Sequence, residues 1–82
     1  MKGFIFSYLT DYVEESFGLA LVDELLTEID LPSKGIYVAY ESYAFSELVA
    51  LVSAVSEKKQ IPLEDLLEGF GRFVFPHLIT RH

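Results

Sequence analysis

The chain has 82 residues, which is enough for one domain with a modest core and too few for two. It contains no cysteine, so disulfides, zinc–thiolate sites, thiol nucleophiles and thiolate haem ligation are excluded. Its net charge of −7, with only six basic residues, argues against a nucleic-acid-binding surface, because phosphate recognition needs clustered Lys and Arg.

The apolar composition of the chain also limits what it can do. Apolar residues make up 51% of the chain, among them seven Phe and five Tyr, and the mean hydropathy is +0.33. Because so small a domain exposes much of its surface, part of this apolar surface is expected to face a partner, a ligand or another piece of protein. The longest stretch without a charge or a histidine, residues 48–56, is too short to span a bilayer, and the N-terminus does not resemble a signal peptide. We therefore expect a soluble, cytoplasmic protein.

Two amphipathic helices are predicted in the first third of the chain. The first covers residues 4–17, where Ile5 and Leu9 lie on one face among other apolar residues. Gly18 is expected to end it, because glycine adopts the left-handed conformation at low cost. The second helix is predicted over residues 19–30, with its apolar residues at helical spacing.

A turn and a short extended segment are predicted next. Residues 31–35 combine proline, serine and glycine and are expected to break the helix. Residues 36–40 are β-branched and aromatic, which favours an extended backbone. No partner strand is recognisable in the chain, so the segment is expected to stay short and not to form a sheet.

Two further helices are predicted in the second half. The third carries apolar residues between 48 and 55 and ends in basic residues at 58–59, which suit the helix dipole. Ser42 or Ser46 is expected to cap its N-terminus. Pro62 fits the first position of a fourth helix, whose apolar residues recur every three or four positions. The fold is therefore predicted to be all-α, with four helices and one short extended segment.

The last ten residues are too apolar for the end of an amphipathic helix. Apolar side chains in the stretch Phe73–Ile79 surround the helix, and Pro76 removes a backbone donor, so the helix is expected to bend or stop there. A helix that is apolar on all sides normally lies inside a larger protein. Residues 1–82 are thus expected to form a single helical domain or subdomain that is incomplete at its C-terminal end. The isolated chain is expected to self-associate through Phe73–Ile79 to cover this surface.

No group of residues in the sequence supports catalysis or a metal site. The two histidines, His77 and His82, are five positions apart, so on a helix their rings point about 140° apart, and a packed or solvated histidine is the favoured interpretation. Adjacent carboxylates, such as residues 14–15, are interpreted as a solvated face. The serines lack a nucleophile elbow, and the glycines in residues 69–71 indicate close helix packing. We expect no enzymatic activity.

Short motifs along the chain are distinctive in combination. They are Met-Lys-Gly-Phe-Ile-Phe at 1–6, Leu-Pro-Ser-Lys-Gly-Ile-Tyr at 31–37, Ser-Ala-Val-Ser-Glu-Lys at 53–58, Ile-Pro-Leu-Glu-Asp-Leu-Leu at 61–67 and Phe-Gly-Arg-Phe-Val-Phe-Pro at 70–76. Together they resemble the haem nitric oxide/oxygen binding (H-NOX) domain family of bacterial gas sensors and soluble guanylate cyclases. The resemblance covers essentially the whole chain.

The resemblance implies a haem held between this N-terminal helical subdomain and a later, mixed α/β subdomain. By position, it implies that Ile5, Leu9, Val74 and Leu78 line the distal side of the haem. Family members that hold oxygen use distal hydroxyl, indole or amide donors, whereas the matching Leu9 and Val74 are apolar. The resemblance therefore implies a nitric oxide sensor that regulates a signalling enzyme of the cyclase or histidine kinase type. Taken without the family, the same apolar residues would be interpreted as plain core.

One departure from the family concerns how the haem is anchored. The resemblance places the proximal histidine and the Tyr-x-Ser-x-Arg propionate clamp beyond the last residue, and Tyr40-Glu41-Ser42 is followed by Tyr43 and Ala44 and so does not match the clamp. Since an axial ligand and a guanidinium hold haem, we expect haem in the full-length domain and little or none in this chain alone.

Two alternative interpretations remain open. The first is a stand-alone, haem-free acidic helical module that binds another protein. The second is unusual ligation of haem by His77 or His82.

Overall fold

Four helices make up the fold, which confirms the predicted all-α class. The structure, a computed structural model, describes residues 2–29, 37–38 and 40–80, without the side chains of 78–80. The helices are α1 (Gly3–Phe17), α2 (Leu19–Glu28), α3 (Phe45–Lys59) and α4 (Leu63–Thr80). Within the described ranges the backbone forms no strand, and its one β feature is an isolated antiparallel bridge between Lys2 and Ser42.

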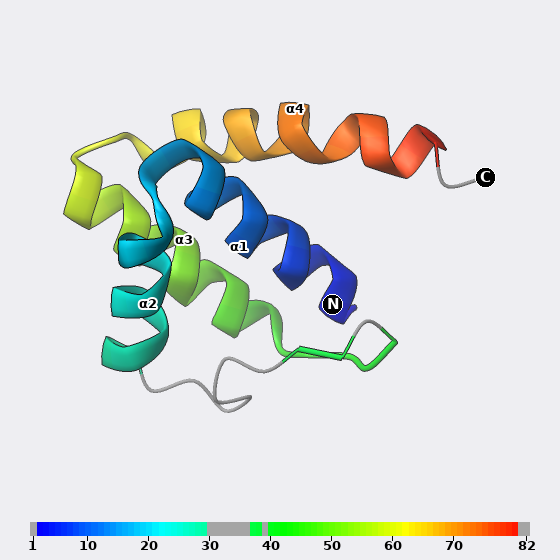
Figure 1. Cartoon of the computed structure of the whole chain (residues 1–82), viewed down its shortest axis with the longest axis horizontal. Coiled ribbons are helices and arrows are strands. Elements are labelled where there is room, and N and C mark those ends of the chain that lie inside the picture. Colours follow the sequence, from blue (N-terminus) through cyan, green and yellow to red (C-terminus); the bar gives the residue numbers. More distant parts are fainter. Residues whose placement is uncertain (1, 30–36, 39, 81–82) are drawn as a thin grey trace.

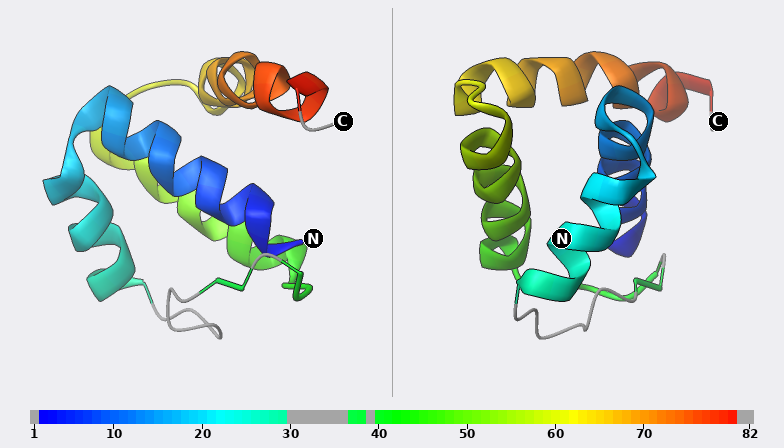
Figure 2. Two further views of the ribbon diagram at one scale, coloured as in Figure 1. Left: turned by 45° about the vertical axis from the view of Figure 1, so that its right-hand side comes forward. Right: turned by 60° about the vertical axis from the view of Figure 1, so that its left-hand side comes forward.

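The helices are arranged as two connected pairs (Figures 1 and 2). α2 turns back from the end of α1 at Gly18, whose φ of 99° lies in the region that favours glycine, so the predicted stop is confirmed. α3 runs behind α1, and α4 then crosses over the two of them (Figures 1 and 2). In the described part of the chain, no helix is long and apolar enough to cross a membrane.

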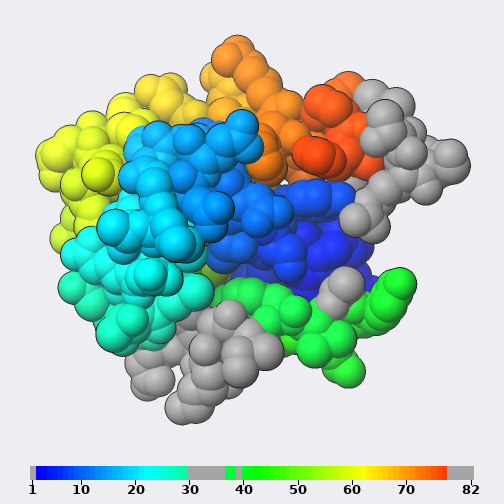
Figure 3. Space-filling model, in the orientation of Figure 1, coloured from blue at the N-terminus to red at the C-terminus, as the bar shows by residue number. Residues whose placement is uncertain are grey.

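One continuous apolar core joins all four helices. Eleven buried side chains belong to it: Phe6, Leu9, Val13, Leu21, Val22, Leu25, Leu48, Leu51, Val52, Val55 and Leu66. The predicted helical periodicity produces this core, because residues three or four positions apart share a helix face. Viewed from outside, α2 and the C-terminal half of α1 form one unbroken surface above it (Figure 3).

The ends of α3 and α4 correct three expectations. α3 begins at Phe45 after Ala44, without a side-chain cap, so the prediction of Ser42 or Ser46 as the cap is wrong. Ser42 lies in the bridge to Lys2, and Ser46 lies inside the first turn of the helix. The third correction is small, because α4 begins one residue later than predicted and the Pro62 carbonyl accepts its first backbone hydrogen bonds.

α4 continues through Pro76 to Thr80, so of the expected bend or stop at Pro76 the stop is wrong. Proline removes only one intrahelical hydrogen bond, the one that would reach the carbonyl of Arg72. Both residues lie on the exposed side of the helix, where that carbonyl is accessible to solvent. The helix therefore keeps its remaining turns.

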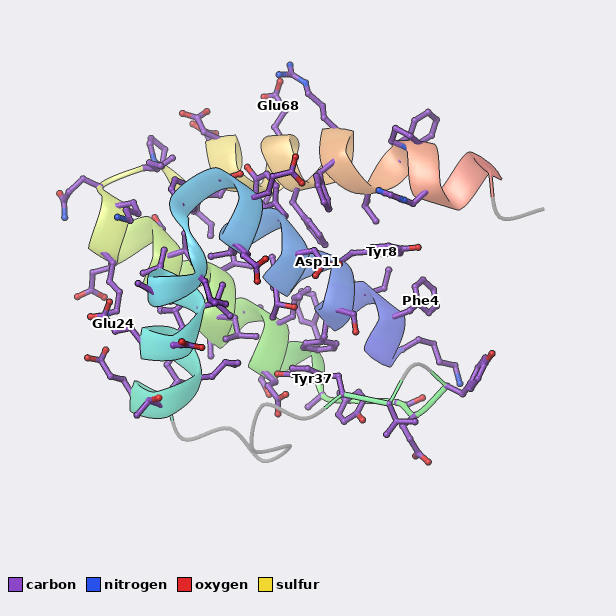
Figure 4. The ribbon with its side chains drawn as sticks, in the orientation of Figure 1. Phe4, Tyr8, Asp11, Glu24, Tyr37 and Glu68 are labelled. Carbon is purple, nitrogen blue, oxygen red and sulfur yellow. The ribbon has the colours of Figure 1, made fainter. Side chains whose placement is uncertain are left out.

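The segment before α3 is held against the N-terminus of α1. The Phe6 ring is fully buried and stacks on Tyr37 with ring centroids 4.6 Å apart, while Tyr43 lies 5.6 Å from the same ring (Figure 4). The Tyr43 hydroxyl accepts a 2.7 Å hydrogen bond from the Val38 N–H. Residues 37 and 38 lie outside any helix, whereas positions 36 and 39 of the predicted extended segment lie outside the described residues.

A lysine clamp joins α2 to α3 and predicts a pH dependence of stability. Lys58 Nζ lies 2.7 Å from Glu28 Oε2 and 3.0 Å from Glu24 Oε1. The hydrogen bonds to Glu28 and then to Glu24 raise the pKa of Lys58 above its ordinary 10.5. Because the folded pKa is the higher one, the stabilisation is complete below pH 10.5 and is lost as the pH rises through the folded pKa.

Lys58→Met is therefore expected to lower the Tm modestly at neutral pH and to match the native chain above the folded pKa. Thermal unfolding followed by circular dichroism from neutral to strongly alkaline pH measures this difference. High salt should shrink it, because exposed ion pairs are screened. A Tm difference that is constant across the whole pH range would contradict the prediction.

Candidate functional site

Aromatic rings line the contact between α1 and α4. We call this set the aromatic seam: Tyr8 and Tyr12 on α1, with Phe70, Phe73 and His77 on α4, extended along α1 by Phe4, whose ring meets Tyr8 edge-on. The Tyr12 ring lies 5.9 Å from Phe70 and 5.6 Å from Phe73, and the Tyr8 ring stacks on His77 at 5.0 Å. Tyr12, later in α1, meets the earlier α4 residues Phe70 and Phe73, whereas Tyr8 meets the later His77. The two helices therefore run in opposite chain directions where they cross.

Each of the four predicted haem-wall residues lies next in sequence to a residue of this seam. Each follows a seam residue by one position: Ile5 after Phe4, Leu9 after Tyr8, Val74 after Phe73 and Leu78 after His77. One position is a turn of about 100° around a helix. Because the helices run in opposite directions, that turn places Ile5, Leu9 and Val74 on the same side of the seam.

The burial of these residues agrees with a position on the side of the seam that faces the core, which we call the inner side. Leu9 is 4% exposed and Val74 is 9% exposed, and Ile5 is partly buried against the core. Leu78 belongs to α4, but its side chain lies outside the described ones. The structure therefore places three of the four predicted wall residues on the inner side, and the fourth by its helix position alone.

Leu9 is more enclosed than the sequence suggested. α2 and α3 cover the Leu9 side chain. Leu9 lines two small voids of about 10 Å³ each, one toward α2 and one beneath α4. A void of that size holds about one water, so neither void accommodates a porphyrin.

The other side of the seam opens to solvent as an acidic groove. This groove has a volume of about 550 Å³ and is lined by Tyr8, Asp11, Glu14, Glu15, Phe73 and His77 (Figure 4). Its carboxylates are exposed, in agreement with their interpretation as a solvated face. The His77 ring packs between Tyr8, at 5.0 Å, and Phe73, at 5.6 Å. That is the packed arrangement favoured from the sequence, and it lies away from the wall residues.

The alternative in which a histidine ligates haem iron gains no support from neighbouring metal-ligand side chains in the part of the chain described. Among the described residues no cluster of three or more His, Cys, Asp or Glu side chains is arranged to hold a metal ion. His82 lies outside the described residues.

Sequence reasoning missed an apolar groove between α3 and α4. The groove has a volume of about 210 Å³ and is lined by Phe45, Leu48, Val49, Val52, Leu63 and Leu67. Phe45 is 63% exposed and Leu67 is 48% exposed. The available signal was the four-residue spacing of 45 and 49 and of 63 and 67, which makes two apolar faces with no assigned partner.

The wall residues suit one face of a haem but not its ligation. Ile5, Leu9 and Val74 are apolar, so their chemistry suits a porphyrin surface, and they carry neither a ligand atom nor a hydrogen-bond donor. In this structure Leu9 and Val74 are buried among the chain's own helices, and Ile5 is the one of the three that is only partly buried.

Comparisons with known proteins place this arrangement in context. The family model described as Haem-NO-binding matches residues 2–82. A crystal structure of the Fe(II) unliganded H-NOX protein from K. algicida is similar, with 36% identity and a TM-score of 0.91, over 95% of this chain and 42% of that chain. A single-residue variant of the same protein gives 35% identity and a TM-score of 0.95, over 100% and 44%. This chain therefore spans less than half the length of these solved relatives, and a comparison with curated proteins gave no match.

Proposed function

The chain belongs to the Haem-NO-binding (H-NOX) family, and on that premise we propose that it is the N-terminal, distal-side helical subdomain of a haem-based nitric oxide sensor. The observation that supports the proposal is the apolar inner side of the aromatic seam, where Ile5, Leu9 and Val74 carry neither a haem ligand nor a hydrogen-bond donor. The family binds haem, which supplies the iron at which a gas is held. The subdomain acts as a binding module and not as an enzyme.

The apolar wall decides which gas the haem retains. A bound oxygen molecule gains from a hydrogen-bond donor beside it, and neither Leu9 nor Val74 provides one. Nitric oxide needs no such donor. The chain's contribution is therefore to exclude water from the distal side and to leave bound oxygen without stabilisation.

The proximal ligand, in this proposal, lies in a part of the protein beyond these 82 residues. The His77 ring supports this, because it is stacked on Tyr8 on the groove side of the seam, away from Leu9 and Val74. The 82-residue chain alone is then expected to take up little haem. Its downstream partner is a signalling enzyme of the cyclase or kinase type.

Haem and gas titrations test the function. Ferrous haem is added to the 82-residue chain and to the natural protein that contains it, and absorption spectra are recorded under nitric oxide and under oxygen. The natural protein is expected to show a stoichiometric Soret band and a nitric oxide adduct but no stable oxygen adduct, and the short chain little haem. A stable oxygen adduct would contradict the sensor assignment. Absence of haem from the natural protein would instead favour the haem-free acidic interaction module.

A matched pair of substitutions sharpens that experiment. Val74→Asn places an amide donor on the wall and is expected to lengthen the lifetime of bound oxygen. Val74→Leu keeps the wall apolar and should not. Equal oxygen lifetimes in the two variants would show that Val74 does not face the gas.

Self-association of the short chain is proposed through Phe73–Ile79. Phe75 in this stretch is 61% exposed, whereas Val74 is buried, so Phe75 is the residue expected to meet a second copy. Phe75→Glu should lower the mass seen by light scattering at high concentration, and Leu19→Glu, at an exposed apolar residue on α2, should not. A native chain that stays monomeric at high concentration would contradict the proposal.

A further inference from the structure

A tyrosine and a glycine form a close contact where α1 crosses α4. A Cβ placed on Gly69 would overlap the Tyr12 hydroxyl and lie 3.2 Å from Tyr12 Cζ. The Tyr12 ring also lies beside Phe70 and Phe73, so it fills a notch on α4 whose floor is Gly69. The missing side chain of Gly69 thus permits the observed spacing of the two helices.

We infer that Tyr12 and Gly69 are positioning residues, which set the distance between the two halves of the distal haem wall. The inference rests on the proposed function, because the wall has a role only if the protein holds haem. Neither residue lies on the wall itself. They act through the helices that carry Leu9 on one side and Val74 on the other.

The contact is coupled to both halves of the wall through close packing. On α1, Leu9 precedes Tyr12 by one turn, and the two side chains line the same void of about 10 Å³. On α4, Val74 follows Phe73, whose ring centroid lies 5.6 Å from that of Tyr12. The added methyl group would meet the end of the Tyr12 side chain, whose ring is flanked by Phe70 at 5.9 Å and Phe73 at 5.6 Å and so has little room to turn. If the ring keeps its place, the methyl group separates the helices at Tyr12 and moves Leu9 relative to Val74.

Gly71 provides a matched control on the same helix. It lies two positions after Gly69, and no described atom is within 4 Å of the place where its Cβ would stand. Alanine favours a helix interior more than glycine does, so both Gly→Ala changes have the same intrinsic effect on α4. The two variants differ only in what the new methyl group meets.

The experiment uses the haem-loaded natural protein in five forms: native, Gly69→Ala, Tyr12→Phe, the double variant and Gly71→Ala. The ferrous nitrosyl spectrum and the nitric oxide dissociation rate are measured in each. Gly69→Ala is expected to shift the spectrum and to change the rate at least about fivefold, in line with coupling between residues in contact. Tyr12→Phe removes the overlapping hydroxyl and should restore native values in the double variant. Gly71→Ala should leave both quantities unchanged.

The outcomes separate this inference from the proposed function. A Gly69→Ala protein with native spectrum and rate overturns the inference, and so does an effect that Tyr12→Phe does not reverse. Should Gly69→Ala alone not fold, the double variant still decides, because native values in it support the inference and altered values overturn it. A native protein that takes up no haem would overturn the proposed function first, before any variant is compared.

Discussion

Replacement of Phe6 by alanine is expected to remove a large part of the free energy of unfolding of this chain. Phe6 is fully buried at the centre of the core, and its ring contacts both Tyr37 and Tyr43. A buried Phe→Ala substitution costs about 3–5 kcal/mol in lost transfer energy and residual cavity. Small domains are stable by roughly 0.05–0.15 kcal/mol per residue, which gives about 4–12 kcal/mol for a chain of this length.

Urea unfolding monitored by circular dichroism measures the Phe6→Ala effect. Leu19→Ala is the control, because Leu19 is 56% exposed and its truncation should change stability by no more than about 0.5 kcal/mol. Near-equal unfolding midpoints for the two variants would show that Phe6 is not central to the core. A selective loss of tyrosine near-ultraviolet signal in Phe6→Ala would show in addition that residues 37–43 depend on this ring.

Gly3→Ala is expected to be the second most damaging single change. Gly3 is buried, and a Cβ there would overlap the Val38 carbonyl oxygen, with Val38 C at 2.7 Å and a Tyr43 ring carbon at 2.9 Å. The obstacle is backbone, and that carbonyl is held by a hydrogen bond from the Glu41 N–H, so it cannot move aside easily. Overpacking of this kind typically costs about 1–3 kcal/mol.

Thermal unfolding tests the Gly3 prediction. For a domain of this size 1 kcal/mol corresponds to roughly 4–8 °C in Tm, so the Gly3→Ala shift is readily measured. Gly71→Ala is the control, since its methyl group meets no described atom and alanine should stabilise the helix by about 0.5–1 kcal/mol. A Gly3→Ala chain as stable as the native one would mean that residues 37–43 do not pack on α1 as described.

Local patterns in the sequence were sufficient for the helices. The stop at Gly18 was predictable because it depends on one residue's backbone freedom, and the basic end of α3 because it depends on charges within one turn. The capping serines and the stop at Pro76 were predicted wrongly. Both depend on surroundings: Ser42 is drawn into a bridge with Lys2, and Pro76 lies on an exposed face that tolerates one unpaired carbonyl.

The candidate site likewise has features that the sequence predicts and features that depend on the fold. The identity of the wall residues, and hence the absence of a hydrogen-bond donor at Leu9 and Val74, is a property of the sequence and follows once the family is recognised. Which of them are enclosed was decided by the fold, since α2 and α3 cover Leu9 while Phe45 and Leu67, equally apolar, remain exposed. Helical periodicity shows which residues share a face but not which neighbour that face meets.

The amino-acid sequence by itself thus determined the helix count, the acidic and cysteine-free chemistry and the apolar character of the wall. Only the tertiary structure decided that α1 and α4 cross in opposite directions along an aromatic seam. That crossing turns Ile5, Leu9 and Val74 to one side and the carboxylates to the other. The physical reason is that residue spacing is a property of one helix, whereas the distance and direction between two helices depend on contacts such as Tyr12 against Gly69, far apart in the chain.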